Sequence, residues 1–360
     1  MDFIKGMDIS MLKELEDLGV AYYTAQRVKK DCLDILKEYD VNAIRLRIWN
    51  HPYDVEMNPY GGGTNDYNTT RDLAKRVVEK GMDFFLDFHY SDFWADPGKQ
   101  IPPKSWVNMG WEELGEAVYQ YTYETINNLK KENLMPNMVQ IGNEITNGLL
   151  WPIGKLSNVE NMAHLLNAGI QATKDVSKEI KIMLHLDDGG NNALYRRWFD
   201  SILPYELDFD VIGLSYYPFW HGTLEDLSYN LNDISKTYNK DVIVAETAYG
   251  FTTKEYGSEA AIFSDELAEK VPYEVSPEGQ AHFMNDLMKV IKEVGGERGL
   301  GFFYWEPGWV PTPKSFWASE IGKEYIKDDC SGENAWANLA LFDFEGVALP
   351  ALEAIRKFNG

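Results

Sequence analysis

The amino-acid sequence predicts a single α/β domain folded as a (β/α)8 TIM barrel. Short apolar runs rich in β-branched and aromatic residues alternate with longer amphipathic stretches, and this alternation occurs eight times. No change in composition and no Ser/Pro-rich linker divides the 360 residues. Barrels of this kind span about 250 to more than 400 residues, so we expect one barrel over residues 1–360.

Each apolar run is expected to form a parallel strand, because strands separated by helices pair through crossovers, and eight such units can close on themselves. The predicted strands are residues 3–9, 43–48, 83–88, 138–141, 181–186, 211–215, 241–245 and 299–305. Ser276 and Pro277 predict the start of one intervening helix, with Ser as N-cap and Pro at the first helical position. Long loops at 50–68, 90–108, 247–275 and 306–339 follow strand carboxyl ends, where barrels build active sites.

The charge and aromatic content indicate a neutral partner. A net charge of −23 disfavours nucleic acid and anionic membranes, whose binding usually rests on Lys and Arg. Aromatic residues make up 14% of the chain, including 11 Trp, which suggests flat apolar binding surfaces. No stretch approaches the roughly 20 apolar residues of a membrane span. We expect a monomer, secreted if a signal peptide was removed and cytoplasmic if Met1 is the native start.

Two carboxylates end strands that lie across the barrel from each other. Glu144 follows the fourth predicted strand and Glu246 the seventh. Glycoside hydrolysis needs one protonated carboxyl to donate to the leaving oxygen, while a retaining enzyme needs a second, ionised one as nucleophile. The pair therefore predicts a glycosidase, although the residues alone leave open which glutamate has which role.

Several motifs resemble glycoside hydrolase family 53, the arabinogalactan endo-β-1,4-galactanases. They span nearly the whole chain and read GMD at 6–8, FHYSDFWADPGKQ at 88–100, QIGNE at 140–144, SYYP at 215–218, AET at 245–247, YWEP at 304–307 and ALFDF at 340–344. The resemblance implies retaining cleavage of β-1,4-galactan, the neutral side chain of pectin, with Glu144 as acid/base and Glu246 as nucleophile. It implies no required cofactor.

Further residues are expected to support this pair. Arg45 is preferred over Arg47 as the residue that keeps Glu246 ionised, on the assumption that only one of the two faces the lumen. Tyr216 is preferred over Tyr217 as a hydrogen-bond donor to the same carboxylate. The other expected substrate-binding residues are Asn143 at the sugar 2-hydroxyl, His89 at the −1 subsite, Asp187 unless it caps the next helix, and Trp94, Trp305 and Trp309 as stacking platforms, with Trp220 also at the rim.

Metal and disulfide chemistry are not expected at the site. Some family members carry a calcium loop after the seventh strand, but residues 250–277 lack alternating oxygen ligands, leaving Glu259, Asp265 and Glu266 as ligands for a different calcium site. The histidines show no paired metal-binding spacing. Cys32 and Cys330 are expected to be buried thiols rather than a disulfide.

The residues leave two rival functions open. Another retaining barrel endoglycanase, acting on mannan or glucan, would use the same glutamates, since linkage and epimer depend on loop shape. A catalytically inert carbohydrate-binding barrel is the second, and the presence of both Glu144 and Glu246 argues against it.

Overall fold

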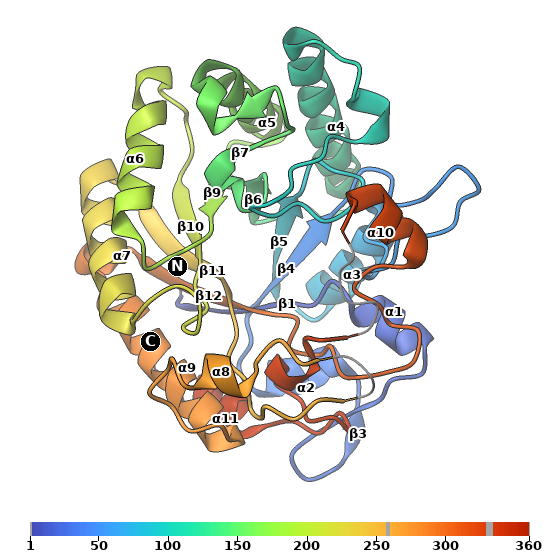
Figure 1. The fold of residues 1–360 in the computed structure, drawn as a ribbon, viewed down its shortest axis with the longest axis vertical. Helices are drawn as coiled ribbons and strands as arrows, with labels where there is room; N and C mark the ends of the chain where they lie inside the picture. Colours follow the sequence, from blue (N-terminus) through green and yellow to red (C-terminus); the bar gives the residue numbers. More distant parts are fainter. Residues whose placement is uncertain (1, 257–259, 329–333, 360) are drawn as a thin grey trace.

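The computed structural model describes residues 2–256, 260–328 and 334–359. Within them, parallel strands close into a barrel in the order β1-β12-β11-β10-β9-β6-β5-β4 (Figure 1). This confirms the predicted TIM barrel, and each predicted strand is present to within two residues at either end. The strands are β1 (Ile4–Asp8), β4 (Ala43–Ile48), β5 (Asp83–Phe88), β6 (Met138–Ile141), β9 (Lys181–Leu186), β10 (Val211–Ser215), β11 (Asp241–Thr247) and β12 (Gly299–Trp305).

Helices surround the barrel (Figure 1). They are α1 (Leu12–Asp17), α2 (Cys32–Glu38), α3 (Tyr67–Glu79), α4 (Trp111–Lys131), α5 (Val159–Val176), α6 (Asn192–Ile202), α7 (Leu224–Tyr238), α9 (Pro277–Lys292) and α11 (Pro350–Lys357), with the short α8 (Asp265–Ala268) and α10 (Glu320–Ile326) in loops. Helix α9 begins as predicted, because the Ser276 hydroxyl accepts a 3.0 Å bond from the Gly279 amide. Two small hairpins, β2–β3 (Tyr22–Tyr23, Lys29–Lys30) and β7–β8 (Gly148–Leu149, Gly154–Lys155), lie outside the barrel sheet.

The barrel interior consists of an apolar layer with a polar layer above it. Side chains near the strand starts form a separate buried cluster of Ile4, Ala43, Phe85, Met138, Met183, Val211, Ile243, Ala245 and Phe303. Residues two positions further along a strand point to the same face. Those positions are polar and buried on four strands, where they are Arg45, Asp87, Gln140 and His185. The apolar layer therefore closes the lower lumen and directs polar groups toward the carboxyl ends.

Gly6 shows how tightly the lumen is filled. A Cβ atom at this position would lie 2.3 Å from the Phe303 ring, which occupies the space that a side chain would need. Residues near the two ends of the chain also lie close together, because the rings of Phe3 and Phe358 are 5.3 Å apart. No helix among the described residues is long and apolar enough to cross a membrane.

Candidate active site

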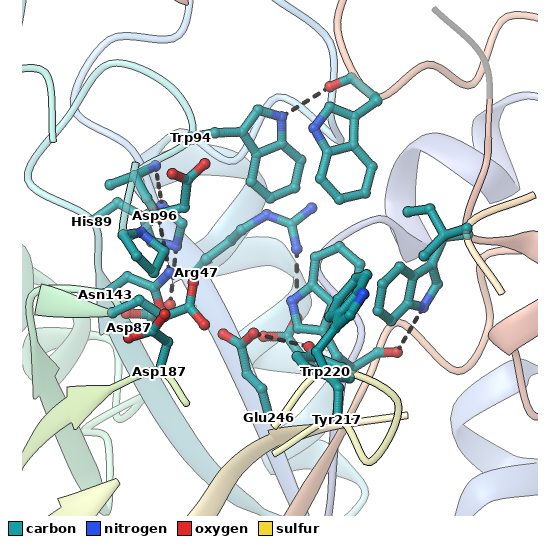
Figure 2. Close-up of a pocket in the computed structure, with 18 of the residues that line it drawn as sticks. Arg47, Asp87, His89, Trp94, Asp96, Asn143, Asp187, Tyr217, Trp220 and Glu246 are labelled. Atoms are coloured by element: carbon teal, nitrogen blue, oxygen red, sulfur yellow. Dashed lines mark hydrogen bonds and ion pairs between the residues drawn. The ribbon is translucent and has the colours of Figure 1, made fainter. Parts of the chain in front are cut away.

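A cavity of about 340 Å³ opens at the carboxyl ends of the strands. Figure 2 shows Glu246 pointing into it, with Asp187 and Trp220 on either side. Of the site residues predicted from the sequence, those that line this cavity are His89, Trp94, Asn143, Glu144, Asp187, Trp220, Glu246 and Trp305. The two glutamates thus meet in one pocket although about a hundred residues separate them.

Glu246 reaches the pocket through an irregularity in the sheet. Ile243 and Ala245 belong to the apolar lumen layer, so simple alternation would turn Glu246 outward. Strand pairing instead shifts register between Leu214 and Ser215 of β10, which pairs Ser215 with Glu246. A β-bulge of this kind re-aims a side chain, and it brings this carboxylate into the cavity.

Two donors contact the Glu246 carboxylate. Arg45 Nη1 lies 3.0 Å from Oε1, and the Tyr217 hydroxyl donates a 3.1 Å bond to Oε2. Burial raises the pKa of Glu246 to about 7, with further upward contributions from Asp8 and Asp87, against the lowering effects of Arg45 and Tyr217. Without those two donors, burial would favour the protonated acid still more strongly.

Arg45 is the centre of a buried network in which it is only 1% exposed. Besides Glu246, its guanidinium contacts Asp8 at 2.9 Å and Asp87 at 2.8 Å. It also donates to Gln140 Oε1 at 3.1 Å and to Asn143 Oδ1 at 2.9 Å. These partners come from β1, β5, β6 and β11 or their ends, so Arg45 links side chains from four other strands of the polar layer.

The expectation that only one of Arg45 and Arg47 faces the lumen is wrong. Residues two apart on a strand share a face, and Arg47 also lines the pocket. Its guanidinium pairs with Glu306 at 2.5 Å and lies 4.4 Å from the Trp94 ring centroid. Arg47 therefore lies on the lumen side, beneath an aromatic wall, and does not pack among the helices.

Glu144 occupies a different environment at the end of β6. Its backbone is left-handed, with φ of 46°, and the Ser215 hydroxyl donates a 2.6 Å bond to Oε1. Burial, and then the charges of Glu246 and Asp187, raise the pKa of Glu144 well above its ordinary value. No cation contacts this carboxyl among the described residues, so its protonated form is favoured.

Asn143 and His185 support Glu144 from below. Asn143 Oδ1 accepts from Arg45 and its Nδ2 donates 2.9 Å to the Ala95 carbonyl. His185 Nδ1 lies 3.1 Å from Asn143 Oδ1, and its Nε2 lies 2.9 Å from the Ser215 hydroxyl. Sequence reasoning missed the role of Ser215, although it shares a strand face with Val211 of the lumen layer.

The preference for Tyr216 over Tyr217 is also wrong. The Tyr216 hydroxyl donates to the Gly222 carbonyl at 2.9 Å, away from the catalytic carboxylates. Tyr217 follows the inward-facing positions Val211 and Ser215 at even spacing, and it contacts Glu246. Strand parity, extended past the end of β10, would have identified Tyr217.

His89 and Asp187 have well-defined partners in the pocket wall. His89 Nδ1 accepts from the Trp49 indole and from the Ala95 amide, both at 3.2 Å, so Nε2 carries the proton toward Asp87 at 3.1 Å. The Asp187 carboxylate bonds the Thr146 hydroxyl. Asp187 does not cap helix α6, whose N-cap is Asn191.

Five tryptophans line the pocket, namely Trp94, Trp220, Trp305, Trp317 and Trp336. The prediction of Trp309 as a platform is wrong, because its side chain is 0% exposed and stacks behind Trp317 at 5.4 Å. Trp317 and Trp336 were not predicted, since they lie in the long loop after β12, where no periodicity reports which side chains face the cleft.

The possible calcium ligands do not form a site among the described residues. Glu259 lies outside those residues, Asp265 starts helix α8, and Glu266 pairs weakly with Lys270 at 3.9 Å. No group of three or more His, Cys, Asp or Glu side chains in the described part of the chain is arranged to hold a metal ion. Cys32 is buried in α2 with a free thiol, and Cys330 lies outside the described residues.

Comparison with known proteins agrees with this architecture. The sequence profile of glycosyl hydrolase family 53 matches residues 4–355. An endo-β-1,4-galactanase of Bacillus subtilis (strain 168) is 38% identical over 99% of this chain and 86% of its own length.

Two solved structures are also similar. The family 53 catalytic domain of Ignisphaera aggregans is 44% identical with a TM-score of 0.93, covering 99% of this chain and 96% of that one. A structure of fungal β-1,4-galactanases is 31% identical with a TM-score of 0.80, covering 98% of each chain. The resemblance seen in the motifs is thereby confirmed, and this chain belongs to glycosyl hydrolase family 53.

Proposed function

We propose that this glycoside hydrolase is a retaining endo-β-1,4-galactanase that cleaves β-1,4-galactan with Glu144 as acid/base and Glu246 as nucleophile. The observation that carries the proposal is that both glutamates line one pocket in unlike surroundings. Arg45 and Tyr217 contact the Glu246 carboxylate, whereas among the described residues the Glu144 carboxyl is contacted by the Ser215 hydroxyl. Pairs of carboxyls whose environments separate their pKa values are typical of glycosidase acid and nucleophile roles.

In the first step, Glu144 protonates the glycosidic oxygen while Glu246 attacks the anomeric carbon. The raised pKa of Glu144 favours the protonated form, which can donate to the leaving oxygen. Attack neutralises the Glu246 carboxylate, so Tyr217 and Arg45 lose an anionic partner and Arg45 keeps Asp8 and Asp87. In the second step, Glu144, now ionised, takes a proton from water while the water oxygen attacks the anomeric carbon. The bond from that carbon to Glu246 breaks, so the sugar leaves with its configuration retained.

The pocket walls suit a neutral sugar chain. Trp94 and Trp305 present aromatic surface, with ring centroids 6.1 Å apart, and His89 and Asn143 present polar groups close to Glu144 and Glu246. Sugars combine apolar ring faces with hydroxyl edges, and small-molecule sites typically match such ligands with apolar walls and a few polar groups. We propose that residues 1–360 act as one catalytic domain that needs no metal and functions as a monomer.

Digestion of linear β-1,4-galactan tests the reaction. The lengths of the products show whether cleavage is internal. NMR of the newly formed anomer shows whether the configuration is retained. We expect oligosaccharides first, with the β-anomer formed before mutarotation. Release of α-anomer, or faster cleavage of mannan or glucan than of galactan, would contradict the proposal.

A further inference from the structure

A second cavity lies beside the active-site pocket, and we call it the α7–α9 groove. Its volume is about 660 Å³, within the range of about 300–1,000 Å³ for ligand sites. Leu224 begins one wall at the start of α7, Val271 and Tyr273 precede α9, and Asp286 and Lys289 lie on α9. Helices α7 and α9 pack next to each other (Figure 1).

Trp220 is a wall common to this groove and to the active-site pocket. Its side chain is 48% exposed, so the indole presents aromatic surface to solvent where the two cavities meet. Edge-to-face contacts with Tyr217 at 5.5 Å and Phe219 at 4.7 Å hold the ring in place. Tyr217 also donates a hydrogen bond to Glu246. Trp220 therefore lies between the proposed nucleophile and the groove.

The groove carries charges of both signs, from Lys270 and Lys289 and from Glu225, Asp286 and Glu293. Lys289 pairs with Asp286 at 2.9 Å, and the Tyr273 hydroxyl donates to the same carboxylate at 3.2 Å. These polar groups lie beside apolar surface from Val271 and Leu224. Paired charges disfavour a strongly ionic ligand, while hydroxyl and carboxylate groups beside apolar walls suit a polyhydroxylated neutral one.

We propose that a galactan chain held in the active-site pocket continues across Trp220 into the α7–α9 groove, which binds its distal sugars. This inference rests on the proposed galactanase function. The groove then recognises long substrates. Substrates too short to extend past Trp220 should bind without any contribution from the groove.

The double variant Asp286→Ala/Lys289→Ala tests the groove without changing net charge. We expect kcat/KM on long linear galactan to fall about threefold to tenfold, as loss of one or two net hydrogen bonds implies. Hydrolysis of an aryl β-galactobioside should stay at the wild-type rate. The matched control, Lys13→Ala/Asp17→Ala, removes an ion pair on α1 with a 2.7 Å separation, and it should leave both rates unchanged.

A second variant, Val290→Trp, fills the groove from α9 and guards against a folding defect in the first. It should lower kcat/KM on long galactan while sparing the short substrate. Unchanged kcat/KM on long galactan in both variants overturns the inference, as does equal loss on long and short substrates with an unchanged melting temperature. Wild-type protein inactive on both substrates would instead reject the proposed function.

Discussion

The Tyr217 hydroxyl donates a 3.1 Å hydrogen bond to the Glu246 carboxylate, whereas its neighbour Tyr216 bonds the Gly222 carbonyl. Two adjacent tyrosines thus have opposite orientations, and only one contacts the proposed nucleophile. The pair provides a matched comparison in which the same chemical change is made inside and outside the site.

Tyr217→Phe should move the acidic limb of the kcat/KM profile to higher pH. The Tyr217 bond lowers the pKa of Glu246, which burial raises to about 7. Its removal raises that pKa further, so Glu246 ionises only at higher pH. Initial rates on galactan across pH measure the shift. Tyr216→Phe is the control, and an equal shift in both variants would argue against a specific contact with the nucleophile.

Asp187→Asn should move the basic limb in the opposite direction, to lower pH. The Asp187 charge helps raise the pKa of Glu144, after burial and Glu246. Removing this charge lets Glu144 lose its proton earlier as pH rises, so the acid form is lost sooner. The same pH–rate measurement applies, with Asp188→Asn as the control because Asp188 bonds Asn191 and does not line the pocket. A basic limb that stays at the wild-type pH would show that the Asp187 charge does not raise the pKa of Glu144.

Azide distinguishes the two glutamates by product stereochemistry. Glu144→Ala should lower kcat/KM on galactan about 10²- to 10⁴-fold through loss of proton transfer. With an activated aryl galactoside, azide should restore turnover and yield the β-galactosyl azide, because it attacks the covalent intermediate. In Glu246→Ala, azide replaces the nucleophile and should yield the α-product. NMR identifies the anomer of each galactosyl azide. An α-azide from Glu144→Ala and a β-azide from Glu246→Ala would reverse the assigned roles.

Strand parity explains much of what the sequence could predict. Each barrel strand could be located because it is a short apolar run between longer amphipathic stretches. Within a strand, the lumen positions recur at every second residue, as Ala43 and Arg45 or Met183 and His185 do. The same rule, applied correctly, places Arg47 beside Arg45 and selects Tyr217. Both orientations therefore follow from alternation along the strand.

Other features of the site could not be predicted from strand or helix periodicity in the sequence. Glu246 faces the pocket only because the β10–β11 pairing shifts register, and a bulge leaves no clear mark in a single sequence. Trp317 and Trp336 line the pocket from an irregular loop, whereas Trp309 in the same loop is buried behind them. Their orientation depends on tertiary packing, so composition alone predicts aromatic walls without identifying each residue.

Stability should fall as pH rises from about 5 to 8, and Glu306 should contribute to this fall together with Glu144 and Glu246, whose pKa values burial also raises. Burial raises the pKa of Glu306 to about 8 from an ordinary value of 4.5, despite the contact with Arg47. Between these two pKa values the folded state therefore holds a proton that the unfolded chain releases. The resulting stabilisation is fully present below pH 4.5 and is lost as the pH rises through about 8. Melting temperatures across pH measure it. Glu306→Gln should flatten the slope, whereas the exposed Glu320→Gln control should not, and an unaltered slope in Glu306→Gln would refute the assignment.

Galactan side chains still attached to polygalacturonate should be cleaved more slowly at low salt than isolated galactan. The chain carries a net charge of −23, which repels the anionic backbone but not the neutral side chain. Adding salt to physiological strength shortens the screening length to about 8 Å, so the two rates should converge. Initial rates at matched galactose content, from low to physiological salt, measure this effect. Isolated galactan serves as the control, and a constant ratio of the two rates across salt would show that surface charge has no part in substrate choice.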